Sequence, residues 1–275
     1  MLTFNTGETE AELRATYNPE GSVLWQAQKR LLDMAVYLNH IAQKLNIQIR
    51  LDGGNVLGAV RHGGFIPWDD DLDMVIDHKD YARFCKYLID NPHPQYVLQV
   101  HSTDKHTYKE WACLRDLGSE HVMHDSMDAR ERRYHEVQKY RGLHVDIFPY
   151  ENRAIPSLVR LAGKLSCFVN FDLGGKHHLL ANMAYHTLHS IVFPTFRIIG
   201  RLFGDKDCYM HSYGAWFYCK FPEKVLRPYI TIPFEGVPLA APADPHEFCK
   251  ILYKNYMDLP PKDKRDNHQC DVRLK

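Results

Sequence analysis

The sequence predicts an α/β fold in which a mixed sheet is flanked by helices and carries a helical insertion. Apolar side chains recur at three- and four-residue spacing over residues 24–45, which is typical of an amphipathic helix. Apolar residues then alternate with polar ones up to Leu51, which predicts a half-buried strand. Gly53 and Gly54 turn the chain into a second helix, and an acidic strand follows at residues 69–76. This order of elements is typical of an α/β domain.

The glycine turn is the first candidate binding element. Asn55 is expected to cap the helix that follows, and Gly63 is expected to end it. N–H groups at the start of a helix have no intrahelical partner, so they suit a phosphate group. We therefore expect Gly53, Gly54 and Asn55 to hold a phosphate of the substrate.

The acidic strand is the second candidate element. Side chains alternate faces along a strand, so Asp69, Asp71 and Asp73 are expected on one face and Asp70 on the other. An exposed acidic turn would explain such a cluster most simply. However, apolar residues 74–76 continue the strand into a core, which places the carboxylates at its mouth. Close carboxylates at a buried edge are typically held by a divalent cation, and Mg²⁺ binds one or two carboxylates plus substrate phosphates.

A lone carboxylate on a later strand completes the set. Residues 144–149 form a short apolar strand that contains Asp146, and a buried charge is costly unless it is paired or bound to metal. We therefore expect Asp71, Asp73 and Asp146 to bind Mg²⁺ or Mn²⁺. Asp146 or Asp69 is expected to take the proton from an acceptor hydroxyl.

Composition and charge narrow the function classes. The chain has 275 residues, and its 34 basic residues are balanced by 34 acidic ones, which argues against a nucleic-acid binder that relies on a broad basic surface. Its seven cysteines are odd in number and form no C-x-x-C pair, which favours reduced thiols. The N-terminus shows no signal-peptide pattern. We therefore expect a cytoplasmic protein that binds no nucleic acid.

Residues 154–221 are expected to be mostly helical. Two core helices are the simpler interpretation of their apolar periodicity. An interfacial helix is the alternative, because Arg197 and Arg201 alternate with aromatic and aliphatic residues, and it would bring a peripheral contact at the inner face of the membrane. Further along, residues 230–239 predict a hairpin that turns at Glu235 and Gly236, and a helix is expected at residues 245–256.

Two segments carry a family resemblance. GGNVLGAVRHGGFIPWDDDLDM at residues 53–74, with GLHVDIFP at residues 142–149, resembles the LicD family of phosphotransferases. That family includes phosphocholine transferases of bacterial surface glycans and resembles fukutin-type ribitol-phosphate transferases. The resemblance extends from about residue 24 to residue 268. It implies a nucleotidyltransferase-like fold in a single domain of residues 1–275, with the helical insertion at about 154–221.

The resemblance also implies an activity. A phospho-alcohol group, phosphocholine from CDP-choline first of all, would pass to a hydroxyl of a glycan, a lipid-linked glycan or lipopolysaccharide, with release of CMP. The residues alone do not separate this donor from CDP-ribitol, CDP-glycerol or CDP-ethanolamine. An aromatic cage would favour choline, and the sequence has 33 aromatic residues that could supply one.

Further binding residues follow from the resemblance. CLRDLGSEH is similar to a basic strand of the family, which favours Arg115 as a phosphate contact, although Cys113 stands where the family often carries a lysine. The C-terminal segment resembles one that folds back beside the active site, so Arg265 and His268 are candidates too.

Arg61 and His62 lie just beyond the glycine-turn helix. They could stabilise the charge of the leaving group, although a structural pair at a helix end is an equal alternative.

Two other function classes stay open. A nucleotidyltransferase that attacks an NTP and releases pyrophosphate would use the same acids. A non-catalytic glycan-binding protein on this fold is less expected, because Asp71, Asp73 and Asp146 are all present.

Overall fold

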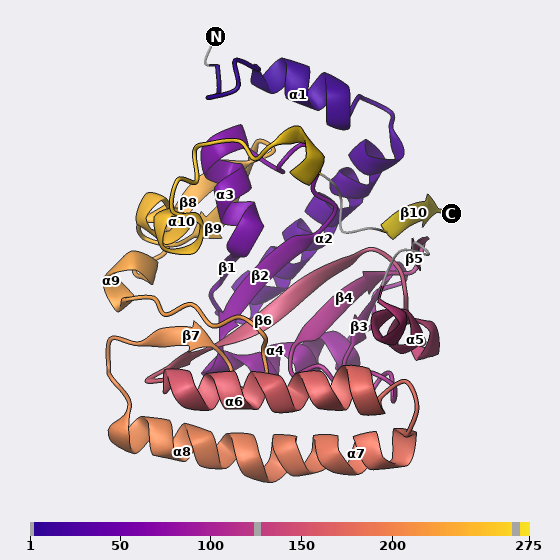
Figure 1. Ribbon diagram of the computed structural model, residues 1–275, viewed down its shortest axis with the longest axis vertical. Coiled ribbons are helices and arrows are strands. Elements are labelled where there is room, and N and C mark those ends of the chain that lie inside the picture. Colours follow the sequence, from indigo (N-terminus) through magenta and orange to yellow (C-terminus); the bar gives the residue numbers. More distant parts are fainter. Residues whose placement is uncertain (1–2, 124–127, 266–269) are drawn as a thin grey trace.

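The structure is a computed structural model that describes residues 3–123, 128–265 and 270–275. Within these residues a six-stranded sheet runs in the order β1, β2, β6, β4, β3, with β7 beside β6 (Figure 1). Its strands are β1 (Ile49–Leu51), β2 (Leu72–Asp77), β3 (Tyr96–Gln99), β4 (Ala112–Asp116), β6 (His144–Asn152) and β7 (Tyr209–His211). β2 and β6 are parallel, whereas the other pairs are antiparallel. The predicted mixed sheet is confirmed.

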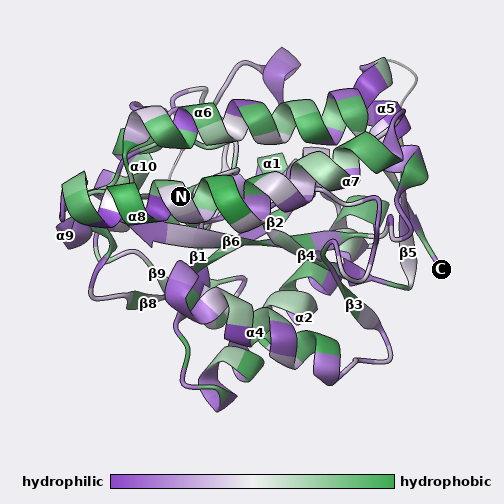
Figure 2. Ribbon diagram, turned by 90° about the horizontal axis from the view of Figure 1, so that it is seen from below, coloured by the Kyte–Doolittle hydropathy of each residue, from purple (hydrophilic) through white to green (hydrophobic). Residues whose placement is uncertain are grey.

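Helices cover both sides of this sheet. The predicted amphipathic helix is α2 (Val23–Lys44), and the Ser22 side chain caps it by accepting from the Trp25 N–H. It packs with α4 (His78–Asp90) against one face of the sheet, while α6 (Pro156–Cys167), α7 (His178–Thr187) and α8 (Phe193–Phe203) lie on the other side (Figure 2).

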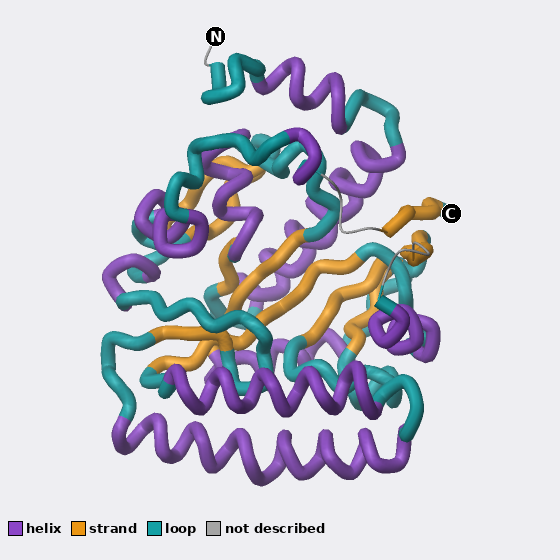
Figure 3. Tube along the Cα trace, in the orientation of Figure 1, coloured by secondary structure: helices purple, strands orange, loops and turns teal. Residues whose placement is uncertain are grey.

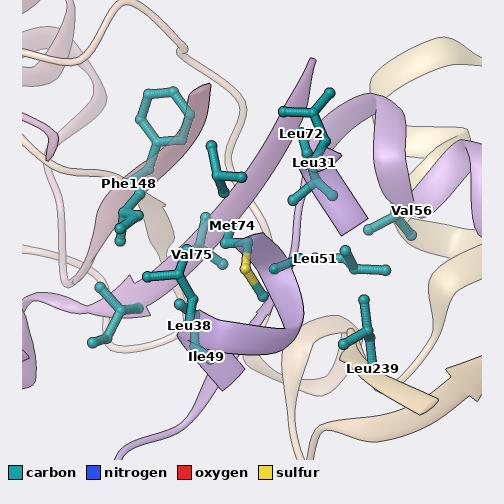
Figure 4. Close-up of a cluster of buried hydrophobic side chains, with 14 of the residues drawn as sticks. Leu31, Leu38, Ile49, Leu51, Val56, Leu72, Met74, Val75, Phe148 and Leu239 are labelled. Carbon is teal, nitrogen blue, oxygen red and sulfur yellow. The ribbon is translucent and has the colours of Figure 1, made fainter. Parts of the chain in front are cut away.

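The main core lies between α2, the sheet and α3 (Gly53–His62). Figure 4 shows how apolar side chains from these elements and from the later hairpin meet. The buried members labelled there are Leu31, Leu38, Ile49, Leu51, Val56, Leu72, Met74, Val75, Phe148 and Leu239. This packing fixes β2 and β6, the two strands that carry the candidate acids, in one register.

The helix after the glycine turn is α3 (Gly53–His62), and its start differs from the prediction. Asp52 is the N-cap residue, so Asn55 already lies in the first turn. The reason is that β1 ends at Leu51 and Gly53, with φ of 48°, turns the chain at once. The end of the helix is as predicted, because Gly63 adopts a left-handed conformation with φ of 72°.

The acidic strand also starts later than predicted. β2 begins at Leu72, and the chain before it turns through a hydrogen bond from the Asp69 N–H to the Ile66 carbonyl. Asp69 and Asp71 therefore precede the strand, and only Asp73 lies within it.

The helical insertion has its own arrangement. α6 (Pro156–Cys167) leads through a π-helical segment, η1 (Phe168–Leu173), to a second layer. That layer is a continuous helix made of α7 (His178–Thr187), the π-helical η2 (Leu188–Val192) and α8 (Phe193–Phe203). No helix in the described part of the chain is long and apolar enough to cross a bilayer.

The expected helical stretch ends earlier than residue 221. Gly204 ends α8 in an extended conformation, and the chain returns to the sheet as β7, which pairs with the end of β6. Side chains from α6 to α8 and from the segment around β7 form a second buried cluster, which includes Phe193, Met210 and Tyr213.

The remaining elements complete the fold. The predicted hairpin is confirmed as β8 (Ile230–Phe234) and β9 (Val237–Ala241), and α10 ends at Tyr253 instead of residue 256. The segment after α10 is a long loop that passes over α3 (Figure 3). The others are α1 (Glu10–Tyr17), β5 (Ser119–Met123), α5 (Ala129–Val137), α9 (Glu223–Leu226), η3 (Lys262–Lys264) and β10 (Cys270–Leu274).

Candidate active site

The acids of two neighbouring strands meet at the start of β2 and β6. Asp73 and Asp146 are direct partners in the parallel register. Their Cα atoms therefore lie about 4.8 Å apart across the two strands, and their side chains share a face of the sheet. On the other side of β6, Cys113 is the partner of Asp146, and its thiol donates to Asp146 Oδ1 at 2.7 Å. Burial raises the pKa of Cys113 to about 12, so this partner is a neutral thiol.

The start of α3 lies against these acids. A Cβ atom built on Gly53 would lie 3.4 Å from Asp73 Oδ2, and one on Gly54 would lie 3.4 Å from Asp69 Oδ2. Larger side chains at these two positions would fill the space between the helix and the carboxylates. The glycine pair therefore keeps the N-terminal N–H groups of α3 open toward the acids.

Asn55 holds this arrangement together. Its side chain accepts a hydrogen bond from the Asp73 N–H at 2.6 Å and donates to the Asp71 carbonyl at 3.2 Å. The N–H groups of Asn55 and Val56 both bond to the Asp52 carbonyl. Gly53 and Gly54 are thus the positions whose N–H groups suit a phosphate, while Asn55 fixes the acidic segment to α3.

The electrostatics of the site centre on Asp73. Burial raises the pKa of this carboxyl well above its ordinary value, and the negative charges of Asp71, Asp146, Asp52 and Asp69 raise it further. A cation placed among these oxygens would offset that repulsion, and carboxylate oxygens are the ligands that Mg²⁺ and Mn²⁺ prefer. The donor chemistry therefore fits a divalent metal.

The described carboxylates are not close enough together to form a complete metal site without substrate. Within residues 3–123, 128–265 and 270–275, no three His, Cys, Asp or Glu side chains gather closely enough to hold a metal ion by themselves. Mg²⁺ commonly takes only one or two carboxylates and completes its shell with substrate phosphates and water. The predicted set of Asp71, Asp73 and Asp146 thus stays a prediction for the substrate-bound state.

A cavity of about 660 Å³ opens beside the acids. Its lining includes Asp52, Gly53, Gly54, Asp69, Asp71 and Asp73. Most of the remaining lining is aromatic, and we call these residues the aromatic wall: Phe148, Tyr150, Trp216, Phe217, Tyr218, Phe221, Phe248 and Tyr253. This volume suits a small-molecule ligand, with charged groups at the acids and an apolar or cationic group at the rings.

A buried network that the sequence did not reveal supports the glycine turn. Asp52 accepts hydrogen bonds from Arg50 at 3.1 Å, from the Tyr150 hydroxyl at 3.1 Å and from His211 Nε2 at 2.7 Å. Burial opposes the charge of Asp52, but His211 and Arg50 outweigh it and hold the pKa of this carboxyl below its ordinary value. Asp52 could have been suspected from its place before Gly53, whereas nothing local marks His211, which is 159 positions away.

Other predicted binding residues lie away from this cavity. Arg61 and His62 end α3, about 13 Å along the helix from Gly53. His62 Nδ1 lies 2.6 Å from Glu10 Oε2, and Arg61 donates to the Tyr256 carbonyl at 2.9 Å. This pair joins α3 to the two ends of the chain, which is the structural alternative.

The two predicted arginines of the later chain are also engaged elsewhere. Arg115 is buried and donates to Gln99 Oε1 at 2.7 Å and to the Gly142 carbonyl at 2.9 Å. Arg265 donates to the Pro260 carbonyl at 2.8 Å and pairs with Glu8. His268 lies outside the described residues.

Comparisons with known proteins agree with this arrangement. Residues 46–158 match the family model described as LicD/FKTN/FKRP, nucleotidyltransferase domain. Lipopolysaccharide cholinephosphotransferase LicD of Haemophilus influenzae is 23% identical over 246 residues, which are 86% of this chain and 92% of that protein. Ribitol 5-phosphate transferase FKRP of Homo sapiens is 38% identical over 60 residues, 22% of this chain and 12% of that protein. An uncharacterized protein of Rickettsia typhi is 46% identical over 138 residues, 49% of this chain and 40% of that protein. Residues 46–158 of this chain are therefore similar to the nucleotidyltransferase domain of the LicD family.

Proposed function

We propose that the protein is a phosphotransferase that moves a phospho-alcohol group from a CDP-activated donor to a hydroxyl of a surface glycan or lipopolysaccharide, and leaves CMP. The observation that carries this proposal is the register of Asp73 with Asp146 beside the glycine start of α3. It combines clustered carboxylates with N–H groups that suit a phosphate. The LicD relative, named for cholinephosphate transfer to lipopolysaccharide, supports the same class of reaction.

The chain's own residues would share the work as follows. Asp71, Asp73 and Asp146 would hold Mg²⁺ or Mn²⁺, which when bound cancels negative charge on the donor diphosphate. The N–H groups of Gly53 and Gly54 orient a donor phosphate. Asp69 or Asp146 accepts the proton of the attacking hydroxyl.

Cys113 has a consequence for Asp146. A lysine on β4 would pair with this carboxylate, whereas the neutral thiol leaves its negative charge for a metal ion or a proton. Asp146 in this chain therefore keeps both roles open.

The aromatic wall of the cavity supports choline as the alcohol. A quaternary ammonium is attracted to ring faces, and aromatic residues make up much of the cavity lining. CDP-ribitol is the second candidate, because the FKRP relative is named for ribitol 5-phosphate. A ribitol group would need hydrogen-bond partners for its hydroxyl groups, whereas a choline group would need ring faces around its ammonium group.

We further propose a cytoplasmic location with a peripheral contact at the inner face of the membrane. The six described cysteines that are free thiols, Cys85, Cys113, Cys167, Cys208, Cys219 and Cys249, support a reducing compartment.

Product analysis tests the proposal. The purified protein is incubated with Mg²⁺, a lipopolysaccharide or glycan acceptor and each of CDP-choline, CDP-ribitol, CDP-glycerol and CDP-ethanolamine, and CMP is measured by chromatography. CMP from one of these donors, lost on chelation of the metal, is the expected result. Pyrophosphate release from an NTP would instead support the nucleotidyltransferase alternative, and no product from any donor would favour a glycan-binding protein.

A further inference from the structure

The outer helix of the insertion exposes a row of large apolar side chains. Leu179, Met183, Ile191, Ile198 and Leu202 follow one another at intervals of one or two helical turns along α7, η2 and α8, so they share one side of the helix. The exposed fractions are high, at 75% for Leu179, 63% for Ile191 and 69% for Leu202. We call this row the insertion face. Figure 2 shows hydrophobic segments recurring along these helices.

Charge is distributed unevenly around the insertion face. Residues 153–204 contain six arginines and lysines but a single acidic residue, Asp172. The rest of the chain holds the other 28 basic and 33 acidic residues, so it is net negative. Arg160, Lys164, Lys176 and Arg201 of the insertion are exposed. A basic, apolar surface is thus carried by a protein that is neutral as a whole.

We propose that the insertion face docks on an anionic lipid bilayer. The row lies on a helix that follows the exposed Lys176 and contains the exposed Arg201, and aliphatic side chains beside basic residues match the boundary between acyl chains and negatively charged headgroups. A second copy of this chain is a poorer occupant, because two positively charged faces would repel each other. The helix is about 39 Å long and lies along the molecular surface, which suits a position in the plane of the bilayer.

The inference deepens the peripheral contact proposed above, on which it rests, and it connects that contact to the cavity. Gly163 of α6 packs so closely on the segment after β7 that a Cβ atom there would lie 2.8 Å from the Ala215 carbonyl and would clash with Tyr218. Tyr218 also belongs to the aromatic wall of the cavity. Docking through the insertion would therefore hold this wall near the lipid surface, where a lipid-linked acceptor presents its hydroxyl.

Vesicle flotation tests the docking surface. The full chain is mixed with vesicles of phosphatidylcholine alone, or with 30% phosphatidylglycerol added, at low and high salt. We expect binding to the anionic vesicles at low salt, with a loss of at least tenfold when Leu179, Ile191 and Leu202 are replaced together by Gln. The matched control replaces Val23, Leu117 and Met257, which are exposed apolar residues outside the insertion, and should bind as the wild type does.

A second pair of variants tests the charge. Replacing Arg160, Lys164 and Lys176 together by Gln should weaken binding to the anionic vesicles at least tenfold at low salt. Each basic group near the bilayer surface contributes about fivefold to binding. Replacing Lys79, Lys250 and Lys262 together by Gln should change vesicle binding little, because these exposed lysines lie outside the insertion.

The outcomes separate this inference from the catalytic proposal. Asp73→Asn should float with the vesicles like the wild type even if it is inactive. Absence of vesicle binding, or equal binding by the Leu179, Ile191 and Leu202 variant, would overturn the inference. The inference would also be overturned if the wild type sedimented as a dimer and this variant as a monomer, because a second copy would then cover the insertion face. Circular dichroism of each variant confirms that it is folded.

Discussion

Replacing Asp73 by Asn should have opposite effects on activity and on stability. Burial and four neighbouring carboxylates raise the pKa of Asp73, so the folded state prefers this group protonated. The wild type therefore suffers no penalty below the unfolded pKa of about 4 and loses stability as the pH rises toward the raised pKa. The loss is about 1.4 kcal/mol for each pH unit in that interval. Asn removes the charge while keeping the shape.

At neutral pH with the divalent cations chelated, Asp73→Asn should thus raise the free energy of unfolding by at least about 1 kcal/mol, or about 2–4 °C in Tm for a chain of this size. Mg²⁺ with a CDP-alcohol should stabilise the wild type and leave the variant unchanged. Turnover should fall about a thousandfold or more, which corresponds to roughly 4 kcal/mol.

Thermal unfolding between pH 4 and pH 8 and CMP release measure the two effects on the same preparations. Asp70→Asn is the control at a neighbouring buried acid that does not line the cavity, and it should retain far more turnover than Asp73→Asn. A variant that is less stable than the wild type throughout this pH range in chelator, or that turns over at a near-normal rate, would refute the reasoning.

Further outcomes follow from the same site. Asp146→Asn should lose turnover as Asp73→Asn does, and partial rescue by excess Mg²⁺ would identify it as a ligand and not the base. Gly54→Ala should raise KM for the donor about tenfold without lowering Tm, because its methyl group would occupy space beside Asp69 while favouring the helix; an unchanged KM would contradict a phosphate there. His211→Ala should destabilise the protein by about 1–3 kcal/mol at neutral pH, since Asp52 loses a buried partner. The pKa of Asp52 is lowered, so this stabilisation is present above its unfolded value of about 4 and is lost as the pH falls through the folded pKa. Urea titrations at pH 7 and pH 3 should therefore show the gap between wild type and His211→Ala closing in acid.

Local patterns predicted much of the fold. The periodicity of residues 24–45, the hairpin at Glu235 and Gly236, and the order of strands and helices around Gly53 all depend on residues close in sequence. The first and last residues of the helices and strands were less predictable. Gly53 starts α3 earlier than Asn55 would, because its left-handed backbone makes the turn by itself.

The roles of the acids stay predictions, and the surroundings of the acids could not be predicted from local sequence. The alternation around Asp71 and Asp73 is local, whereas the aromatic lining combines Phe148 and Tyr150 with residues 216–221 and 248–253, which follow the whole insertion. Arg115 resembled a phosphate ligand, yet its guanidinium is buried against Gln99 and the Gly142 carbonyl. A charged residue on a strand can serve packing or catalysis, and only its three-dimensional partners separate the two.

The proposed phosphotransfer is tested most directly by following the phosphorus atoms of the donor. Phosphorus NMR of CDP-choline with the protein, Mg²⁺ and a lipopolysaccharide or glycan acceptor distinguishes the diphosphate, CMP and the product. We predict that the diphosphate signals disappear, that CMP appears in equal amount with a new phosphodiester on the acceptor, and that Asp71→Asn and Asp73→Asn both stop the reaction. An intact diphosphate under these conditions and with the other CDP-alcohols, or the same phosphodiester formed at normal rate by Asp73→Asn, would contradict the proposal.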